Sequence, residues 1–167
     1  SNVDYQGVTV DEVLMGDGLP EGNYTICIQA FDYITGTPFS LPEPAGCSAV
    51  FSILHVDPPQ IMTPFCGMEV IAQNPQHMVI TWTRPVGILG VEYLLTITEL
   101  FEGQDPNEAV LSSPFPPFFE TTTMAPNYMY SLADPELEVG KTYVIQVQAI
   151  DPGGKVVFKN EGRSEVC

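Results

Sequence analysis

The sequence contains two closely similar short segments, and this repeat constrains the fold more than any other feature. Residues 24–32 read "YTICIQAFD" and residues 143–151 read "YVIQVQAID". β-Branched and aromatic residues recur at every second position in both copies, which predicts a β-strand. Each copy ends in Asp and a turn, and a second candidate strand follows, "CSAVFSIL" or "GRSEVC". The repeated unit is therefore predicted to be a hairpin.

The distance between the copies predicts two consecutive modules. The first residues of the copies, Tyr24 and Tyr143, are separated by about the length of one β-sandwich module and a joint. Only the second copy is preceded by a full set of candidate strands, which are "PQIMTP", "HMVITWTRP", "VEYLLTITELF", "FFETTT" and "NYMYSL". Pro58 and Pro59 in "HVDPPQ" would stiffen a joint. We therefore predict one domain over residues 1–56 and another over residues 57–167.

The predicted first domain has too few strands to form a sandwich by itself. Residues 1–56 are interpreted as the C-terminal part of a preceding β-sandwich module, with "VTVDEVLM" as the one segment that could replace a missing strand. A half-sandwich has an open edge and an uncovered face, so we expect it to pack on the second module or to pair with a neighbouring chain. The opening Ser1 and Asn2, with no Met, also predict a piece of a longer protein.

Charge excludes some classes of partner. The chain has 5 Lys and Arg against 21 Asp and Glu, a formal net charge of -16. Five cations cannot form the clustered basic surface that nucleic acid requires, and anionic membrane surfaces are excluded for the same reason. No apolar run is long enough to span a bilayer. We expect no nucleic acid and no direct membrane insertion.

The four cysteines, Cys27, Cys47, Cys66 and Cys167, favour disulfides over a metal site. None forms a CxxC pair, and neither histidine has a Cys or carboxylate at ligand spacing, so we expect no metal and no cofactor. Cysteines spread along an acidic, strand-rich chain indicate disulfides and an oxidising, extracytoplasmic compartment. Four free, buried thiols are the alternative.

Two aromatic residues are predicted to be structural. Trp82 shares one face of its strand with Met78 and Ile80, which is typical of a core anchor. Tyr143 follows the turn "EVGK", where a sandwich uses a corner tyrosine whose hydroxyl bonds to loop backbone. The next candidate strand points Tyr93, Leu95 and Ile97 inward.

The segments "ITWTRP", "LEVGKTYVIQVQAID" and "GRSEVC" together resemble a fibronectin type III domain over roughly residues 58–167. The predicted fold class is therefore all-β, an antiparallel Ig-like or fibronectin type III β-sandwich preceded by a truncated β-sandwich unit. A narrower resemblance rests on "LPEGNYTICIQAFDYITGTP", "DPPQI" and "VGKTYVIQVQAID", which look like the TANFOR-type region of large exported proteins of Bacteroidetes. That resemblance implies a long multi-domain surface or secreted chain, and it supplies no catalytic residue.

Within this two-module organisation, Cys27 and Cys47 lie on the two strands of one hairpin. Cys66 follows the first strand of the second module and Cys167 ends its last strand. We favour Cys27 with Cys47 and Cys66 with Cys167 over the two other pairings, because each bond then stays inside one module.

Catalytic and calcium-binding patterns are poorly represented. The acidic run Glu99, Glu102, Asp105 and Glu108 lies in a Gly/Pro-containing loop and is interpreted as solvated surface rather than a glycosidase pair. The sequence has no Gly-x-Ser-x-Gly motif. The segments "MGDGLPEG" and "DPGG" resemble turns more than calcium loops. We therefore expect no enzyme activity.

The best candidate binding surface is the Phe/Pro-rich loop 114–119. It holds Phe115, Phe118 and Phe119 among prolines, and exposed rings there could stack on a sugar or contact a protein, whereas buried rings would belong to the core.

We expect a non-catalytic extracytoplasmic structural or interaction module, a spacer, display or adhesion unit whose partners are neighbouring domains of the same polypeptide and possibly another protein or a glycan. The alternatives are a carbohydrate- or protein-binding module that uses loop 114–119, and a receptor-ectodomain fibronectin module.

Overall fold

The computed structural model of the chain describes residues 6–15, 19–112, 114–154 and 156–167. Its contacts divide the chain into two compact units, Ser1–Leu54, called unit 1, and His55–Cys167, called unit 2. The regular structure is mostly antiparallel β, which agrees with the all-β class. That these units correspond to domains 1–56 and 57–167 stays a prediction.

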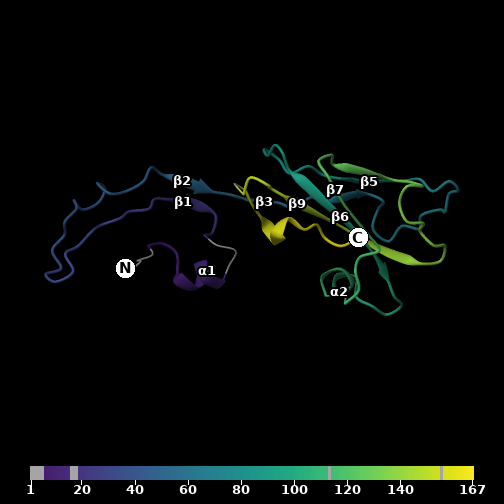
Figure 1. The fold of residues 1–167 in the computed structure, drawn as a ribbon, viewed down its shortest axis with the longest axis horizontal. Coiled ribbons are helices and arrows are strands. Elements are labelled where there is room, and N and C mark those ends of the chain that lie inside the picture. Colours follow the sequence, from purple (N-terminus) through teal and green to yellow (C-terminus); the bar gives the residue numbers. More distant parts are fainter. Residues whose placement is uncertain (1–5, 16–18, 113, 155) are drawn as a thin grey trace. The chain divides into compact units, whose positions relative to one another are not determined.

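Unit 1 is a long hairpin preceded by a short helix (Figure 1). Strands β1 (Gly22–Tyr24) and β2 (Phe51–Ile53) pair antiparallel, with Gly22 opposite Ile53. Beyond them the two segments stay paired through isolated bridges at Cys27 with Cys47 and at Phe31 with Pro38.

The helix α1 (Val10–Met15) corrects one expectation. The sequence predicts residues 8–15, "VTVDEVLM", as the segment that could replace a missing strand, but residues 10–15 are helical. The apolar residues Val10 and Val13 are three positions apart, a spacing that suits a helix face better than a strand face.

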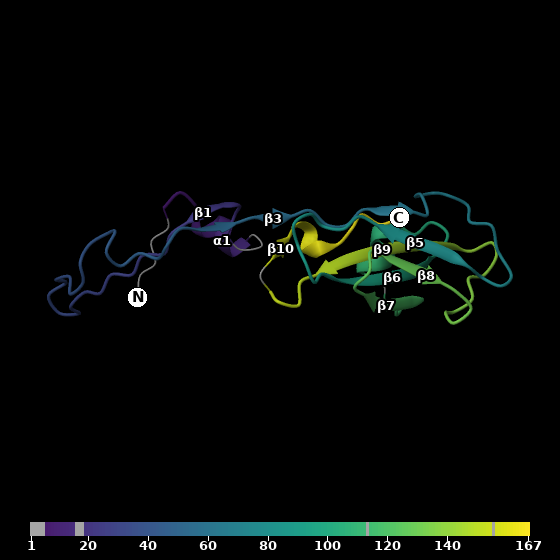
Figure 2. The ribbon, with the colours of Figure 1, turned by 90° about the horizontal axis from the view of Figure 1, so that it is seen from above.

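Unit 2 contains two three-stranded antiparallel sheets (Figure 2). One has the order β4-β5-β8 and the other the order β7-β6-β9. Their bounds are β4 (Ile61–Thr63), β5 (Met78–Trp82), β6 (Glu92–Leu100), β7 (Phe119–Thr123), β8 (Asn127–Tyr130) and β9 (Thr142–Ile150). Strands β6 and β9 pair along their full length, from Glu92 opposite Ile150 to Leu100 opposite Thr142.

The C-terminal segment 163–167 adds a further strand-like edge beside β9. The Ser164 amide donates to the Val147 carbonyl over 2.8 Å, and Cys167 and Ile145 exchange two backbone hydrogen bonds of 2.6 and 2.9 Å. A short parallel pair, β3 (His55–Val56) with β10 (Val157–Phe158), precedes the 3-10 helix η1 (Lys159–Gly162).

One hydrophobic cluster joins the two sheets of unit 2. Ile80 and Trp82 from β5 and Tyr130 from β8 are buried in the same cluster as side chains of β6 and β9. The buried residues of β6 and β9 in the cluster are Tyr93, Leu95, Ile97, Ile145, Val147 and Ala149. The predicted inward faces of these strands are confirmed, because period-two alternation places every second side chain in the core.

The long segment after β6 is not all loop. It contains helix α2 (Pro106–Leu111), whose first turn is capped by the Asp105 carboxylate. That carboxylate accepts hydrogen bonds from the amides of Asn107 (2.8 Å) and Glu108 (3.2 Å). Asp at the N-cap followed by Pro is a helix-start signal, so the prediction of a loop over this run was wrong for residues 106–111. Neither helix in the described part of the chain is long and apolar enough to cross a membrane.

Gly162 is predicted to be intolerant of a side chain. Its φ is +79°, and a Cβ atom there would lie 2.1 Å from the Ala149 carbonyl oxygen. Gly162→Ala should lower the free energy of unfolding of unit 2 by about 2–4 kcal/mol, because left-handed strain and a backbone clash act together. Gly140→Ala is the matched control, since its φ is +83° but the added Cβ meets no atom within 4 Å. Chemical denaturation of both variants, followed by Trp82 fluorescence, compares them, and equal losses would contradict the clash.

Candidate functional site

The Phe/Pro-rich loop 114–119 does not present its three rings together. Phe115 is 68% exposed, whereas Phe118 and Phe119 are half-buried against the core cluster. The Phe118 ring lies 5.1 Å from that of Tyr143, and Phe119 lies 5.0 Å from Tyr130 in an edge-to-face contact. A surface made of all three rings is therefore not formed, and Phe115 is the one of the three that is exposed.

Trp82 is located in the core of unit 2. Its side chain is 3% exposed and its ring packs edge-to-face on Tyr93 with centroids 5.5 Å apart. Trp82 Nε1 is buried and has no hydrogen-bond partner within the described part of the chain, whereas the buried Tyr93 hydroxyl interacts with the Arg84 side chain. Burial raises the pKa of Tyr93, while the nearby Arg84 cation lowers it. The pair stabilises the fold by packing.

Tyr143 makes the hydrogen bond expected of a corner tyrosine. Its hydroxyl accepts from the Glu138 amide over 3.0 Å, which ties the start of β9 to the preceding turn. Near it, Lys141 forms ion pairs with Glu99 (3.1 Å) and Glu138 (3.0 Å) across the same turn. The acidic side chain at Glu99 therefore holds a loop in place.

Two tyrosines of β8 should make unit 2 sensitive to alkali. The Tyr128 hydroxyl donates to the Asp134 carboxylate over 2.7 Å, and Tyr130 donates to the Pro135 carbonyl over 2.6 Å. Burial raises the pKa of each to about 12, and the Asp134 charge adds to both shifts. In the unfolded chain these groups titrate near 10, so the folded state binds more protons between about pH 10 and 12. The contribution of these two tyrosines to stability should thus be constant below pH 10 and fall as the pH rises toward 12.

This prediction is checked by the unfolding midpoint of the chain between pH 8 and 12. The double variant Tyr128→Phe with Tyr130→Phe should flatten the fall, because neither ring can then ionise. Tyr33→Phe is the control, since Tyr33 is fully exposed and its replacement should leave the profile unchanged. An unchanged alkaline fall in the double variant would contradict the assignment.

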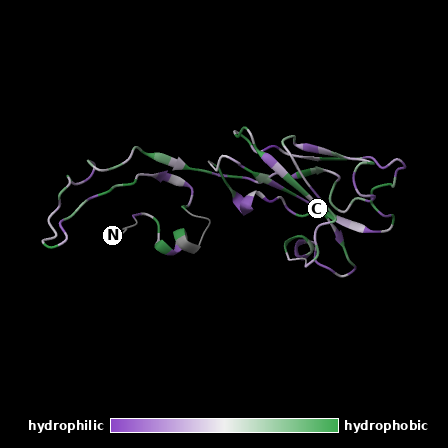
Figure 3. Cartoon of the chain, viewed as in Figure 1, coloured by the Kyte–Doolittle hydropathy of each residue, from purple (hydrophilic) through white to green (hydrophobic). Residues whose placement is uncertain are grey.

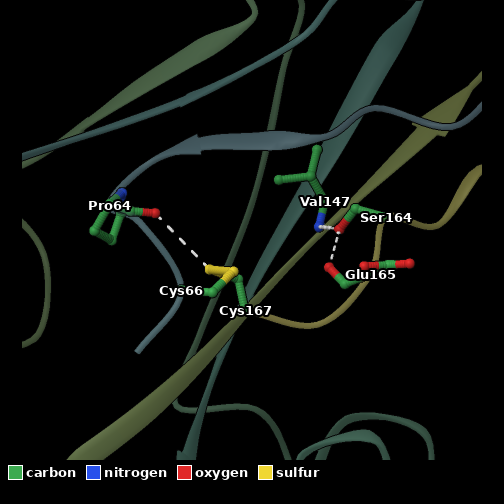
Figure 4. The surroundings of a disulfide bond; sticks show 6 residues. All are labelled: Pro64, Cys66, Val147, Ser164, Glu165 and Cys167. Carbon is green, nitrogen blue, oxygen red and sulfur yellow. Dashed lines mark hydrogen bonds between the residues drawn. A yellow bond between two sulfur atoms is a disulfide. The ribbon is translucent and has the colours of Figure 1, made fainter. Parts of the chain in front are cut away.

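The cysteines form two disulfides, Cys27 with Cys47 and Cys66 with Cys167, and no cysteine is free. One bond lies in unit 1 and the other in unit 2. Figure 4 shows the second, with the Pro64 carbonyl oxygen 3.8 Å from Cys167 Sγ, and it also shows the hydrogen bond between the Val147 amide and the Ser164 hydroxyl. Two intramolecular disulfides indicate an oxidising environment.

A feature that the sequence reasoning missed is a Gly-x-Ser clasp in both hairpins. Ser164 accepts from the Val147 amide through Oγ (3.1 Å), and its own amide donates to the Val147 carbonyl (2.8 Å). Ser48 bonds Ile26 in the same two ways, over 3.1 and 2.8 Å.

The glycine of each clasp leaves room for the facing backbone. A Cβ at Gly46 would lie 2.5 Å from the Ile28 carbonyl oxygen, as one at Gly162 would approach Ala149. The signal was present in the sequence, because "GCS" and "GRS" follow the two repeats. The contact is shifted by two residues along the repeat, because Ser48 bonds Ile26, whereas Ser164 bonds Val147, the equivalent of Ile28.

The Asp that ends each copy closes a turn. Asp32 accepts from the Thr35 amide (2.6 Å) and hydroxyl (2.8 Å) and from the Ile34 amide, and these bonds lower the pKa of its carboxyl. Asp151 accepts from the Gly153 amide over 2.8 Å. Of "MGDGLPEG", residues 16–18 lie outside the described part of the chain. No group of three or more His, Cys, Asp or Glu that could hold a metal ion occurs among the described residues.

A small recess lies beside Tyr93. It has a volume of about 110 Å³, and its lining includes Arg84, Leu89 and Met124. Small-molecule sites are usually larger, from about 300 Å³ upward. The recess therefore has room for a few small polar groups near the Arg84 cation.

Comparisons of the chain with protein-family models, with curated proteins and with solved structures find no match. Its function is consequently inferred from its own residues.

Proposed function

We propose that unit 2 is a fibronectin type III-like variant of the Ig-like sandwich and that unit 1 is the C-terminal part of a preceding sandwich module. Three strands (β4, β5, β8) face four (β7, β6, β9 and segment 163–167) across one core, a partition typical of such sandwiches. The corner hydrogen bond of Tyr143 supports the same assignment. The Gly-x-Ser clasp shared by both units supports a common origin of the two hairpins.

In this proposal the chain is a non-catalytic extracytoplasmic structural or interaction module of a large surface or secreted protein. The observation that carries it is that each unit is closed by its own disulfide. The predicted structural residues Trp82 and Tyr143, and Phe119 of the candidate binding loop, pack or bond within the fold. The module would space, display or join other parts of the polypeptide, as the resemblance to TANFOR-type regions of Bacteroidetes proteins implies.

The test of this location is the redox state of the cysteines in the cells that make the protein. Thiols are alkylated at the moment of lysis, and peptides are then mapped by mass spectrometry without reduction. Peptides linked through Cys27 with Cys47 and through Cys66 with Cys167 are expected in the surface or secreted fraction. Four alkylated cysteines would overturn the extracytoplasmic assignment.

A second candidate function, ligand binding at loop 114–119, is favoured by one observation. Phe115 is exposed among Pro114, Pro116 and Pro117, which are exposed as well. Glycan and protein-partner screens that compare the natural chain with Phe115→Ala test it. Leu132→Ala is the matched control, because Leu132 is a similarly exposed apolar residue outside the loop. A ligand lost in the first variant and kept in the second would establish the site, and no ligand in either screen would leave the spacer role.

A further inference from the structure

The two copies of the repeated strand have opposite surroundings. In the second copy, Ile145 and Val147 are 5% and 0% exposed. The equivalent residues of the first copy, Ile26 and Ile28, are 57% and 74% exposed. Hydrophobic stretches therefore run along the segments between β1 and β2 without a covering layer in unit 1 (Figure 3). Exposed apolar patches of this kind mark interaction surfaces.

Only every second residue of the segment 26–30 forms backbone hydrogen bonds with the other arm of the hairpin. Residues Ile26, Ile28 and Ala30 bond the other arm of the hairpin through their amides or carbonyls. Successive residues of a strand direct their backbone groups to opposite sides, so Cys27 and Gln29 face the other way. Among the described residues, no backbone hydrogen bond involves these two. Unit 1 thus has an open strand edge.

The strand that pairs with the second copy indicates which kind of strand could pair with the open edge of the first. The equivalents of Cys27 and Gln29 are Gln146 and Gln148, which lie opposite Thr96 and Leu94 of β6 in antiparallel register. On the core face, Leu95 of β6 lies opposite Val147. An occupant with the chemistry of β6, extended and apolar at every second position, therefore fits the open edge.

The negative charge of unit 1 favours a basic strand at this edge. Residues 1–54 contain seven acidic residues and no Lys or Arg. The acidic residues are Asp4, Asp11, Glu12, Asp17, Glu21, Asp32 and Glu43. Two copies of unit 1 would repel each other, whereas a strand that carries Lys or Arg at its solvent-facing positions would be attracted.

We propose that residues 24–32 of unit 1 form an acceptor edge for an antiparallel β-strand supplied from outside residues 1–167, apolar at alternate positions and basic at others. Addition of the strand extends the hairpin by backbone hydrogen bonds to Cys27 and Gln29, and its apolar side chains lie beside Ile26 and Ile28. The Cys27–Cys47 disulfide and the Ser48 clasp hold the acceptor in an extended form. This inference deepens the proposed interaction role and rests on it.

The probe is a synthetic peptide with the sequence of residues 91–101, in which Glu92→Lys and Thr96→Lys place cations on the face opposite Tyr93, Leu95 and Ile97, and Glu99→Thr removes the remaining acidic residue. Fluorescence anisotropy of the labelled peptide measures binding to the disulfide-bonded chain. Hydrogen exchange then reports whether the amides of Cys27 and Gln29 become protected. A peptide of the same composition in shuffled order, without the alternation, is the control ligand.

Ile26→Ser with Ile28→Ser should weaken binding of the peptide at least tenfold, and both residues are exposed, so folding should be retained. Ile34→Ser is the matched control, because Ile34 is equally apolar and exposed but lies in the turn. Unchanged affinity in the double variant would overturn the proposal. Equal binding of the shuffled peptide would also overturn it, as would protection of the Cys27 and Gln29 amides in the absence of peptide. Self-association of the chain through this edge, detected by sedimentation, would overturn it as well. The extracytoplasmic location is tested separately, because free thiols in the cell would contradict it and the peptide-binding experiment does not measure thiols.

Discussion

Replacing both Cys66 and Cys167 with serine should lower the free energy of unfolding of unit 2 by about 4–5 kcal/mol. The two residues are 101 positions apart in the sequence, so their bond closes a loop that contains nearly all of unit 2. A cross-link of this span removes much of the conformational freedom of the unfolded chain, and the loop-entropy estimate for about 100 residues is near 4.7 kcal/mol. Urea denaturation followed by Trp82 fluorescence measures the change, because the chain has a single Trp and it lies in unit 2.

The matched control removes the other disulfide. Cys27→Ser with Cys47→Ser alters unit 1 only. The free energy of unfolding of unit 2, followed by Trp82 fluorescence, should stay within about 0.5 kcal/mol of the value for the natural chain, because the substitutions are remote from unit 2. A loss below about 1 kcal/mol in the Cys66/Cys167 variant would contradict the prediction. It would mean that the hydrogen bonds of segment 163–167 to β9 hold the C-terminus without help.

Trp82→Ala should lower the free energy of unfolding of unit 2 by about 3–5 kcal/mol. The side chain is almost completely buried between the two sheets and packs on Tyr93. Truncation removes the apolar contacts and leaves a cavity that the surrounding strands fill only in part. Thermal unfolding followed by circular dichroism gives the change, since this variant lacks the fluorophore.

Trp82→Phe separates packing from loss of the indole N–H. The phenyl ring fills most of the space, and a buried donor without an acceptor disappears. We expect this variant to lose less than half of what Trp82→Ala loses. Equal losses in the two variants would contradict packing as the main contribution of Trp82.

The sequence predicted the roles of residues whose environment is set by local pattern. Trp82, Tyr93 and Leu95 lie on strand faces that alternation alone identifies. Tyr143 was placed by the turn before it, and its hydroxyl bonds that turn. The helix α2 was missed although Asp105 and Pro106 are a recognised helix start, because the surrounding Gly and Pro were given more weight.

Which rings of loop 114–119 are exposed could not be predicted without the tertiary structure. Phe115, Phe118 and Phe119 are the same residue type in one short stretch, and nothing local distinguishes them. Phe118 is held by Tyr143 and Phe119 by Tyr128 and Tyr130, residues that the fold brings from β8 and β9. Contacts between distant strands therefore decided which ring is exposed.

The sequence by itself determined that this chain is β-rich, that its hairpin motif is repeated and which side chains share a strand face, because these properties depend on the period of a local pattern. Only the tertiary structure decided that the two copies differ in burial. Ile145 and Val147 are covered because β6 and the β4-β5-β8 sheet pack on them, whereas Ile26 and Ile28 have no such neighbours within unit 1. Burial depends on what lies opposite a strand, and a similar strand sequence does not encode its own partner.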